Sequence, residues 1–167
     1  MEKTSHDSEI KAKGQQVITV CALINRFKNT ESEIFLAKRS INKKFLPGVF
    51  ELPGGHVDFR ENLVRALKRE VMEEFEVEIS VGDVLAALDY YNPIKESHAV
   101  EIVYFAKIID FDSLKLHPED HENFIWIKEA EVSKICCQKK NEEDQEIQII
   151  KKAFNLLNSG TKLMNTG

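Results

Sequence analysis

Residues 52–75 limit the fold most strongly, because they join a Leu-Pro-Gly-Gly turn to an amphipathic helix. The turn residues favour a tight loop that leaves a strand, and Asn62 is suited to cap the helix that follows. Apolar residues recur along the helix at a spacing that places them on one face, which predicts packing against a core. These residues are Leu63, Ala66, Leu67, Val71 and Phe75.

The other side of the same helix carries Glu70, Glu73 and Glu74. Positions i, i+3 and i+4 share one helical face, and like charges at this spacing destabilise an isolated helix by about 0.2–0.5 kcal/mol per pair. A solvated acidic face is one interpretation of such a pattern. The other is a site for a divalent cation, for which hard carboxylate oxygens favour Mg²⁺ or Mn²⁺ over Zn²⁺.

The spacing of charged residues around these glutamates resembles the signature of the Nudix hydrolases, the MutT-like family. That signature is Gly, five residues, Glu, seven residues, Arg-Glu, an aliphatic residue, any residue and Glu-Glu. The sequence matches it from Gly55 through Glu61 and Arg69 to Glu74. One position departs, because Glu76 stands where the family has a glycine that usually ends the helix in a left-handed conformation. We therefore expect either steric strain at Glu76 or a different helix end.

The resemblance implies a divalent cation, Mg²⁺ or Mn²⁺, as the cofactor. We expect Glu70 and Glu74, which lie one turn apart, to be metal ligands. Glu73 is either a third ligand or the base that orients the attacking water, and the sequence does not separate these roles. In the family the backbone carbonyl at the position of Gly55 also reaches a metal, and a loop glycine permits such a close approach.

Three further residues are expected to take part in catalysis. Arg69 lies one turn before Glu73 and is placed to fix a glutamate by a bidentate bond. Glu61 is expected to act through Arg69 or to bridge a further metal, and an ordinary surface ion pair is the alternative for both. Many family members use another carboxylate from outside the signature. The polar segment 117–123 supplies Glu119, Asp120 and Glu122, of which we favour Glu122 as an extra ligand or base, with a solvated loop residue as the alternative.

Candidate substrate contacts lie in the loops. Residues 38–44 contain four cations, among which Arg39 and Lys44 are expected to face phosphates unless the loop is simply solvated. His56 is expected to contact substrate or to be a plain loop residue, because hard metals prefer oxygen ligands. Tyr91 is one of several aromatic residues suited to stack on a base, although core packing is the usual role of such a side chain.

The remaining pattern predicts an α/β protein with a mixed β-sheet and helices on both faces. The family resemblance specifies this as a Nudix-type α/β/α sandwich. A single domain is expected over residues 16–158, between flexible tails at residues 1–15 and 159–167. Strands are expected at residues 16–25, 33–38, 77–81, 84–91, 99–109 and 124–128, and further helices at residues 129–137 and 145–157.

Composition indicates which partners and which cellular compartment to expect. The net charge of −5 argues against general nucleic-acid binding, because no basic field attracts a phosphate backbone. The 167 residues contain neither a signal-peptide pattern nor an apolar run of transmembrane length, and the three cysteines suit a reducing compartment. We therefore expect a cytoplasmic monomer or homodimer that does not contact membranes.

Together these features predict a hydrolase that cleaves a pyrophosphate bond in a nucleoside diphosphate linked to another group. A nucleoside triphosphate, cleaved to monophosphate and pyrophosphate, is the first expectation, because the chain carries no added domain. A nucleotide sugar of the ADP-ribose or GDP-sugar type is the alternative, indicated weakly by Pro93. A catalytically silent nucleotide-binding module is a further alternative. Such a module would be expected to lack one of the signature glutamates, and this sequence keeps all of them.

Overall fold

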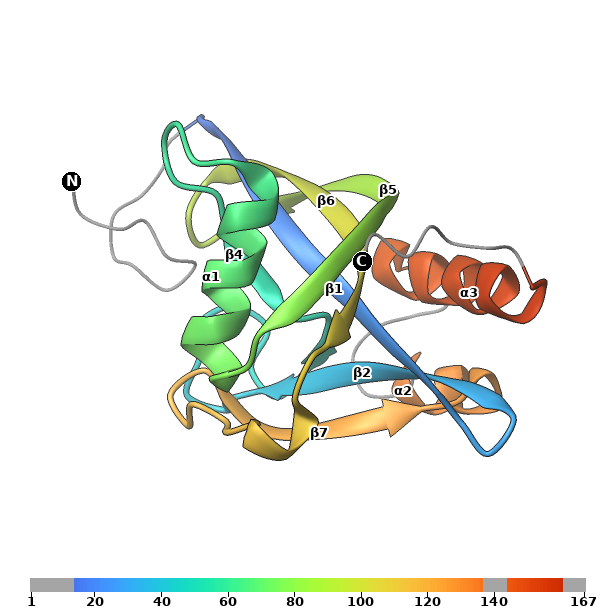
Figure 1. Ribbon diagram of the computed structural model, residues 1–167. Coiled ribbons are helices and arrows are strands. Elements are labelled where there is room, and N and C mark those ends of the chain that lie inside the picture. Colours follow the sequence, from blue (N-terminus) through green and yellow to red (C-terminus); the bar gives the residue numbers. More distant parts are fainter. Residues whose placement is uncertain (1–13, 137–143, 161–167) are drawn as a thin grey trace.

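The computed structural model describes residues 14–136 and 144–160 and contains one mixed sheet flanked by helices (Figure 1). The three α-helices are α1 (Leu63–Phe75), α2 (Val132–Cys136) and α3 (Gln145–Asn158). Short 3-10 turns cover Phe111–Ser113 and Glu129–Glu131. The strands are β1 (Gln16–Lys28), β2 (Glu31–Arg39), β3 (Phe50–Glu51), β4 (Gly54–His56), β5 (Ile79–Asn92), β6 (Ser97–Ile108) and β7 (His121–Ile127).

The strand order is β3-β2-β1-β6-β5, with β4 pairing to β1 and β7 pairing to β2. β1 and β6 run parallel, from Gln16 opposite His98 to Ile24 opposite Ala106. The other pairings are antiparallel, so the sheet is mixed as expected. The long central strand β1 therefore joins the part of the sheet beside β2 and β7 to the part beside β5 and β6.

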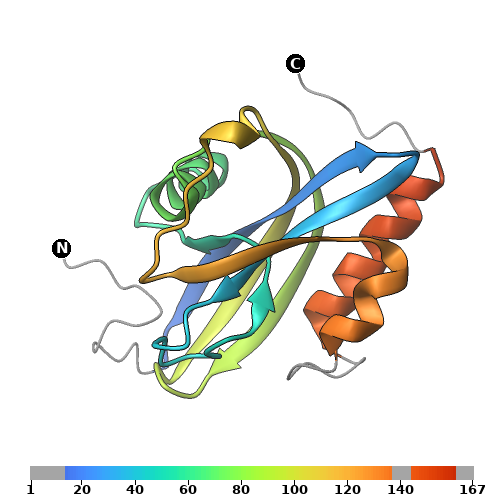
Figure 2. The same ribbon diagram turned by 90° about the horizontal axis from the view of Figure 1, so that it is seen from below.

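Two apolar clusters form the core, one on each face of the sheet. The first receives the apolar side of α1, including the fully buried Leu67, Val71 and Phe75. The second receives α3 and α2, including Ile147 and Phe154. Figures 1 and 2 show α1 on one side of the strands and α2 and α3 on the other. The predicted α/β class with helices on both faces is thus confirmed.

The ends of α1 follow from its sequence. Asn62 has an extended backbone, and its side chain accepts hydrogen bonds from the N–H groups of Val64 and Arg65 at 3.0 and 3.2 Å. The predicted N-cap is therefore confirmed. At the other end, Glu76 adopts the left-handed conformation, with φ 53°. Since a side chain is disfavoured there, this position carries steric strain, and the helix still ends in the usual way.

Two expectations about elements need correction. Gly82 and Asp83 do not interrupt the strand, because β5 continues through them with register shifts between Val81 and Ala86. Such irregularities absorb extra residues without ending a strand. The helix expected at residues 129–137 is a 3-10 turn followed by the short α2.

Most of the predicted tail residues lie outside the described part of the chain, as does residue 137. None of the helices in the described ranges has the length and apolar character needed to cross a membrane.

Candidate active site

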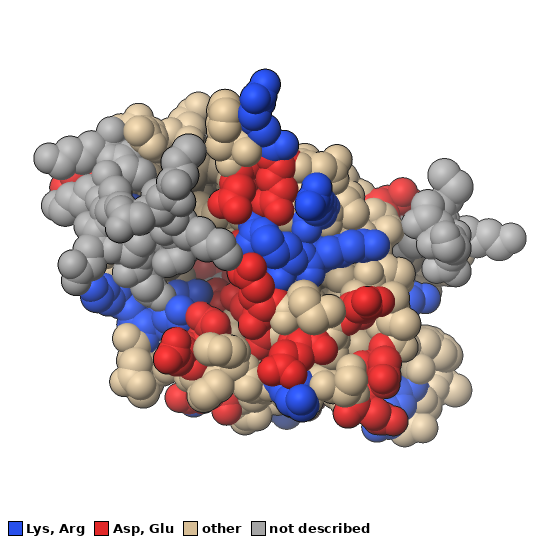
Figure 3. All heavy atoms as spheres, turned by 60° about the vertical axis from the view of Figure 1, so that its left-hand side comes forward, with Lys and Arg blue, Asp and Glu red and all other residues tan. Residues whose placement is uncertain are grey.

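A cavity of about 800 Å³ opens beside α1 and is bounded by residues from both faces of the fold. α1 contributes Arg69 and all three glutamates of its acidic edge to the cavity wall. Acidic and basic side chains lie intermixed on the face of the molecule that carries this helix (Figure 3). Of the other predicted site residues, the wall includes Gly55, His56, Arg39 and Tyr91 but not Glu61, Lys44 or Glu122.

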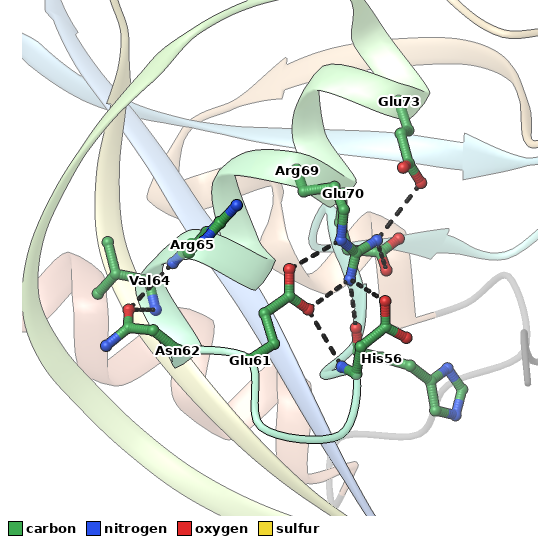
Figure 4. Close-up of polar contacts among 9 residues, drawn as sticks. His56, Glu61, Asn62, Val64, Arg65, Arg69, Glu70 and Glu73 are labelled. Atoms are coloured by element: carbon green, nitrogen blue, oxygen red, sulfur yellow. Dashed lines mark hydrogen bonds and ion pairs between the residues drawn. The ribbon is translucent and has the colours of Figure 1, made fainter. Parts of the chain in front are cut away.

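Arg69 organises the acidic edge of α1 (Figure 4). Its Nε and Nη2 donate to the two carboxylate oxygens of Glu61 at 3.0 and 2.9 Å. Its Nη1 donates to Glu70 at 2.6 Å and to Glu73 at 3.4 Å, and Nη2 also donates to the carbonyl oxygen of His56 at 3.0 Å. The bidentate partner is therefore Glu61, whereas the bond to Glu73 is single and long.

The pKa values of Arg69 and Glu61 agree with their bidentate contact. Hydrogen bonds from Arg69 lower the pKa of Glu61 to about 2, against the smaller opposing effect of burial. The same hydrogen bonds raise the pKa of the Arg69 guanidinium. Glu61 does not reach the cavity, so its structural effect on the site passes through Arg69.

Gly55 approaches the carboxylate of Glu70 closely. A Cβ atom added to Gly55 would lie 2.4 Å from Glu70 Oε2 and 2.5 Å from Glu70 Cδ, so a side chain there would displace the Glu70 carboxylate. The glycine therefore permits its own backbone and the Glu70 carboxylate to share one small region. Arg69 fixes the Glu70 side chain in that position.

Glu74 lies at the centre of a group of acids. Its Oε2 atom is buried and has no hydrogen-bond partner among the described residues. Burial raises the pKa of Glu74 well above its usual value, and the negative charges of Glu51, Glu70 and Asp120 raise it further. The positive charge of Arg39 acts in the opposite direction but does not offset these effects, so Glu74 is less compensated than buried acids normally are.

These observations test whether the site suits a divalent cation. In the conformation of the described residues, no three His, Cys, Asp or Glu side chains converge on one metal position, and Arg69 occupies part of the hydrogen-bonding capacity of Glu70. The orphaned oxygen of Glu74 and the close approach of Gly55 to Glu70 nevertheless supply hard oxygen donors in one region. The residues therefore fit Mg²⁺ or Mn²⁺ in chemical type, with Glu70, Glu74 and the Gly55 carbonyl as the available donors.

A buried ion-pair network adjoins this region. Arg39 Nη1 donates to both carboxylate oxygens of Glu51, at 2.9 and 3.1 Å, and His121 Nε2 lies 3.0 Å from Glu51 Oε1. The His121 ring stacks on Phe75 of α1 with its centroid 4.9 Å away. Burial disfavours ionisation of Glu51, but the hydrogen bond from His121 and the charge of Arg39 outweigh it and lower its pKa to about 2.

Sequence reasoning missed Glu51 and the contact that His121 makes with it. Glu51 had one available signal, because it is an acid within the apolar segment that leads to the glycine turn. His121 had none beyond its place in a polar segment, since its contact with Glu51 depends on the pairing of β2 with β7 and with β3.

The structure does not bring Glu122 to the cavity. β7 begins at His121, and because alternate side chains of a strand point to opposite sides, Glu122 turns outward and pairs with Lys38 at 2.5 Å. The acid that this segment does place on the cavity wall is Asp120, which pairs with Lys43 at 2.7 Å. Lys43, rather than the exposed Lys44, is likewise the lysine on the wall.

His56 and Tyr91 both lie on the cavity wall. Burial lowers the pKa of His56 to about 4, and the positive charge of Lys95 acts in the same direction. At neutral pH the imidazole is therefore uncharged. Tyr91 is 60% exposed, so its ring is accessible at the rim of the cavity.

Comparisons with known proteins agree with this geometry. The family model described as NUDIX domain matches residues 15–152. An 8-oxo-dGTP diphosphatase of Buchnera aphidicola (subsp. Acyrthosiphon pisum) is 33% identical over 64 residues. That match covers 38% of this chain and 49% of the relative, so it spans about half of the relative's length.

Among solved structures, a MutT protein from Methanosarcina mazei Go1 is similar with a TM-score of 0.66 and 26% identity, covering 88% of this chain and 97% of the other. A C. elegans Ap4A hydrolase in a binary complex has a TM-score of 0.69 at 21% identity, covering 86% and 98%, and this likeness concerns the fold. The family model matches most of the chain, and the fold is shared with these structures. The signature residues Gly55, Arg69, Glu70, Glu73 and Glu74 line the cavity. The chain therefore belongs to the Nudix family.

Proposed function

We propose that this protein hydrolyses a pyrophosphate bond in a nucleoside diphosphate linked to another group, with Mg²⁺ or Mn²⁺ as its cofactor. Nucleoside triphosphates, cleaved to monophosphate and pyrophosphate, are its proposed substrates. The observation that carries this proposal is the buried oxygen of Glu74, which has no partner among the described residues and lies among three other acids. A buried structural acid is normally hydrogen-bonded at both oxygens, whereas a metal ligand needs an open oxygen.

The phosphoanhydride resists hydrolysis because its oxygens repel an incoming nucleophile. A divalent cation, when bound, neutralises this charge and lowers the pKa of a coordinated water. Glu70, Glu74 and the carbonyl of Gly55 are the proposed metal-holding groups. The hydrogen bond from Arg69 keeps the Glu70 carboxylate beside Gly55, so this part of the site is ordered before substrate arrives.

Glu73 is proposed as the base that orients the attacking water. Its side chain is 47% exposed, and its bond from Arg69 is 3.4 Å long, so it remains accessible to water at the cavity wall. Arg69 and Glu61 are proposed as positioning residues, because their bidentate pair fixes the guanidinium that holds Glu70. Asp120, rather than Glu122, is the proposed additional carboxylate, because it lies on the cavity wall and adds to the field at Glu74.

The cations of the cavity wall support an anionic substrate. Arg39 and Lys43 both line the cavity and supply positive charge opposite the acidic edge of α1. The neutral His56 offers hydrogen bonding without charge, and the exposed ring of Tyr91 offers a stacking surface. Lys44 lies off the wall, so its proposed contribution is limited to attraction at longer range.

The diphosphatase named among the relatives acts, by its name, on a nucleoside triphosphate, which supports that class over a nucleotide sugar. Pro93 lies on the cavity wall, so a nucleotide sugar remains the second candidate. A silent binding module has less support, because all three glutamates of α1 and Arg69 are present at the cavity.

The test is to incubate the full chain with Mg²⁺ and a panel of nucleoside triphosphates and nucleotide sugars, and to measure released pyrophosphate and monophosphate. We expect metal-dependent release of pyrophosphate from a triphosphate, with Glu73→Gln and Glu74→Gln each reducing turnover by about a hundredfold or more. Full turnover in both variants, or equal turnover after chelation of metal, would contradict the proposal.

A further inference from the structure

A second pair of acids lines the same cavity, separate from the glutamates of α1. Glu101 is contributed by β6, and Glu146 by the first turn of α3. Thr19, which faces Glu101 across the parallel β1–β6 pairing, donates its hydroxyl to Glu101 Oε2 at 3.3 Å. Glu146 Oε1 accepts the N–H of Leu52 at 2.9 Å, which ties α3 to the segment before the glycine turn. Both carboxylates are therefore held in place.

Aromatic side chains lie on the cavity wall together with these acids. The rings of Phe45 and Tyr90 are nearly parallel, with an interplanar angle of 15° and centroids 6.1 Å apart. A ring inserted between them would need about 7 Å, twice the contact distance of roughly 3.5 Å. The pair therefore forms a platform on which a planar heterocycle stacks, rather than a slot.

We propose, building on the hydrolase function proposed above, that this part of the cavity binds the nucleobase and that Glu101 and Glu146 select guanine-type bases over adenine. Carboxylate oxygens accept hydrogen bonds. The Watson–Crick edge of guanine presents two adjacent N–H donors, at N1 and the 2-amino group, followed by the acceptor O6. The corresponding edge of adenine presents one amino donor beside an acceptor nitrogen, so it satisfies fewer of these oxygens.

The protonation state of Glu101 makes this match depend on pH. Burial raises the pKa of Glu101 to about 7, and the charges of Glu146 and Glu51 act in the same direction. The Glu101 carboxyl therefore titrates close to neutral pH. When Glu101 is ionised, it and Glu146 each accept from one of the two N–H donors of guanine, whereas adenine would set its ring nitrogen against a carboxylate oxygen. A site built to hydrogen-bond one edge rejects an analogue that leaves its buried groups unpaired.

Steady-state hydrolysis of GTP, ATP, dGTP and dATP with Mg²⁺ tests this assignment, using the full chain and the variants Glu101→Gln and Glu146→Gln. The control is Glu78→Gln, an exposed acid outside the cavity. We expect the unaltered protein to favour the guanine nucleotides by roughly ten- to hundredfold in kcat/KM. Each cavity variant should reduce that ratio by about tenfold or more by weakening guanine turnover while ATP turnover is retained, and the control should keep it.

Two results would overturn the assignment: hydrolysis without base preference, or equal losses with all four nucleotides in both variants, as a purely structural role predicts. If no nucleotide is hydrolysed, the proposed function fails but the base site is still testable. Calorimetric titration of GMP and AMP then decides, because roughly tenfold tighter binding of GMP, lost in Glu101→Gln and kept in Glu78→Gln, supports the base site. Equal binding of the two monophosphates refutes it.

Discussion

Replacing Glu74 with glutamine is expected to stabilise the metal-free protein while removing its response to metal. The buried Oε2 atom has no partner among the described residues, and Glu51, Glu70 and Asp120 add negative charge around it. An unsatisfied buried polar group costs about 1–3 kcal/mol. The glutamine amide removes the charge and donates N–H groups to the neighbouring carboxylates. For a chain of this length, that gain corresponds to a rise in Tm of about 2–12 °C.

Thermal unfolding in chelator and in Mg²⁺ or Mn²⁺ measures this effect. The free energy of unfolding of the unaltered protein should rise with the logarithm of the ratio of metal concentration to Kd, by about 2.7 kcal/mol when metal is in hundredfold excess over Kd. Glu74→Gln should start from the higher Tm and gain little, and Glu78→Gln, an exposed control, should follow the unaltered protein. A lower Tm for Glu74→Gln in chelator together with an unchanged response to metal would refute the reasoning.

Three other outcomes are expected. Arg69→Lys keeps the charge but loses the bidentate bond to Glu61, so kcat should fall by about 10–100-fold; steady-state kinetics checks this, and equal kcat in Arg69→Lys and the exposed control Arg65→Lys would contradict it. Glu76→Gly should raise the free energy of unfolding in urea by about 0.5–1 kcal/mol, because glycine tolerates the φ of 53°; a lower urea midpoint would argue against strain there. The folded pKa of Glu101 is raised from 4.5 to about 7, so its contribution to the free energy of unfolding is complete below pH 4.5 and decreases by up to ~3 kcal/mol as the pH rises through about 7. In Glu101→Gln the free energy of unfolding in urea should therefore vary less between pH 5 and 8, and an unchanged pH dependence would contradict the shift.

The spacing of residues in the sequence was sufficient to predict the parts of the site that lie on a single helix. The spacing of Glu70, Glu73 and Glu74 places them on one edge of α1 whatever the rest of the fold does, and the structure puts all three on the cavity wall. Asn62 was predictable as the cap for the same reason, since its role depends only on the next three residues. The left-handed conformation of Glu76 was one of two expected outcomes, and helix geometry decided it.

Contacts between distant segments were not predictable in this way. Asp120 lies in the turn before β7, and Glu122 lies within β7 at the irregularity opposite Lys38 and Arg39, so which of the two acids faces the cavity depends on how β7 pairs with β2. The network of Glu51 with Arg39 and His121 requires the pairing of β2 with both β3 and β7. No periodicity within one segment contains that information.

The acids of the second pair were hidden for a similar reason. Glu101 lies in a strand that is otherwise mostly apolar, and Glu146 lies in a helix whose clearest sequence signal is its apolar face. Their common location follows from the parallel pairing of β6 with β1 and from the packing of α3 on that face of the sheet. The Gly82-Asp83 pair predicted a break between two strands that the structure does not contain. The pairing of β5 with β6 tolerates a local irregularity there, so the strand continues.

The most direct test of the central claim is anomalous scattering from Mn²⁺ in crystals of the full chain grown with a non-hydrolysable nucleoside triphosphate analogue. The account predicts an anomalous peak bonded to the carboxylates of Glu70 and Glu74 and to the carbonyl oxygen of Gly55, next to the phosphates of the analogue. A bound analogue with no peak at those atoms, and with Glu74 still lacking a partner, would contradict it.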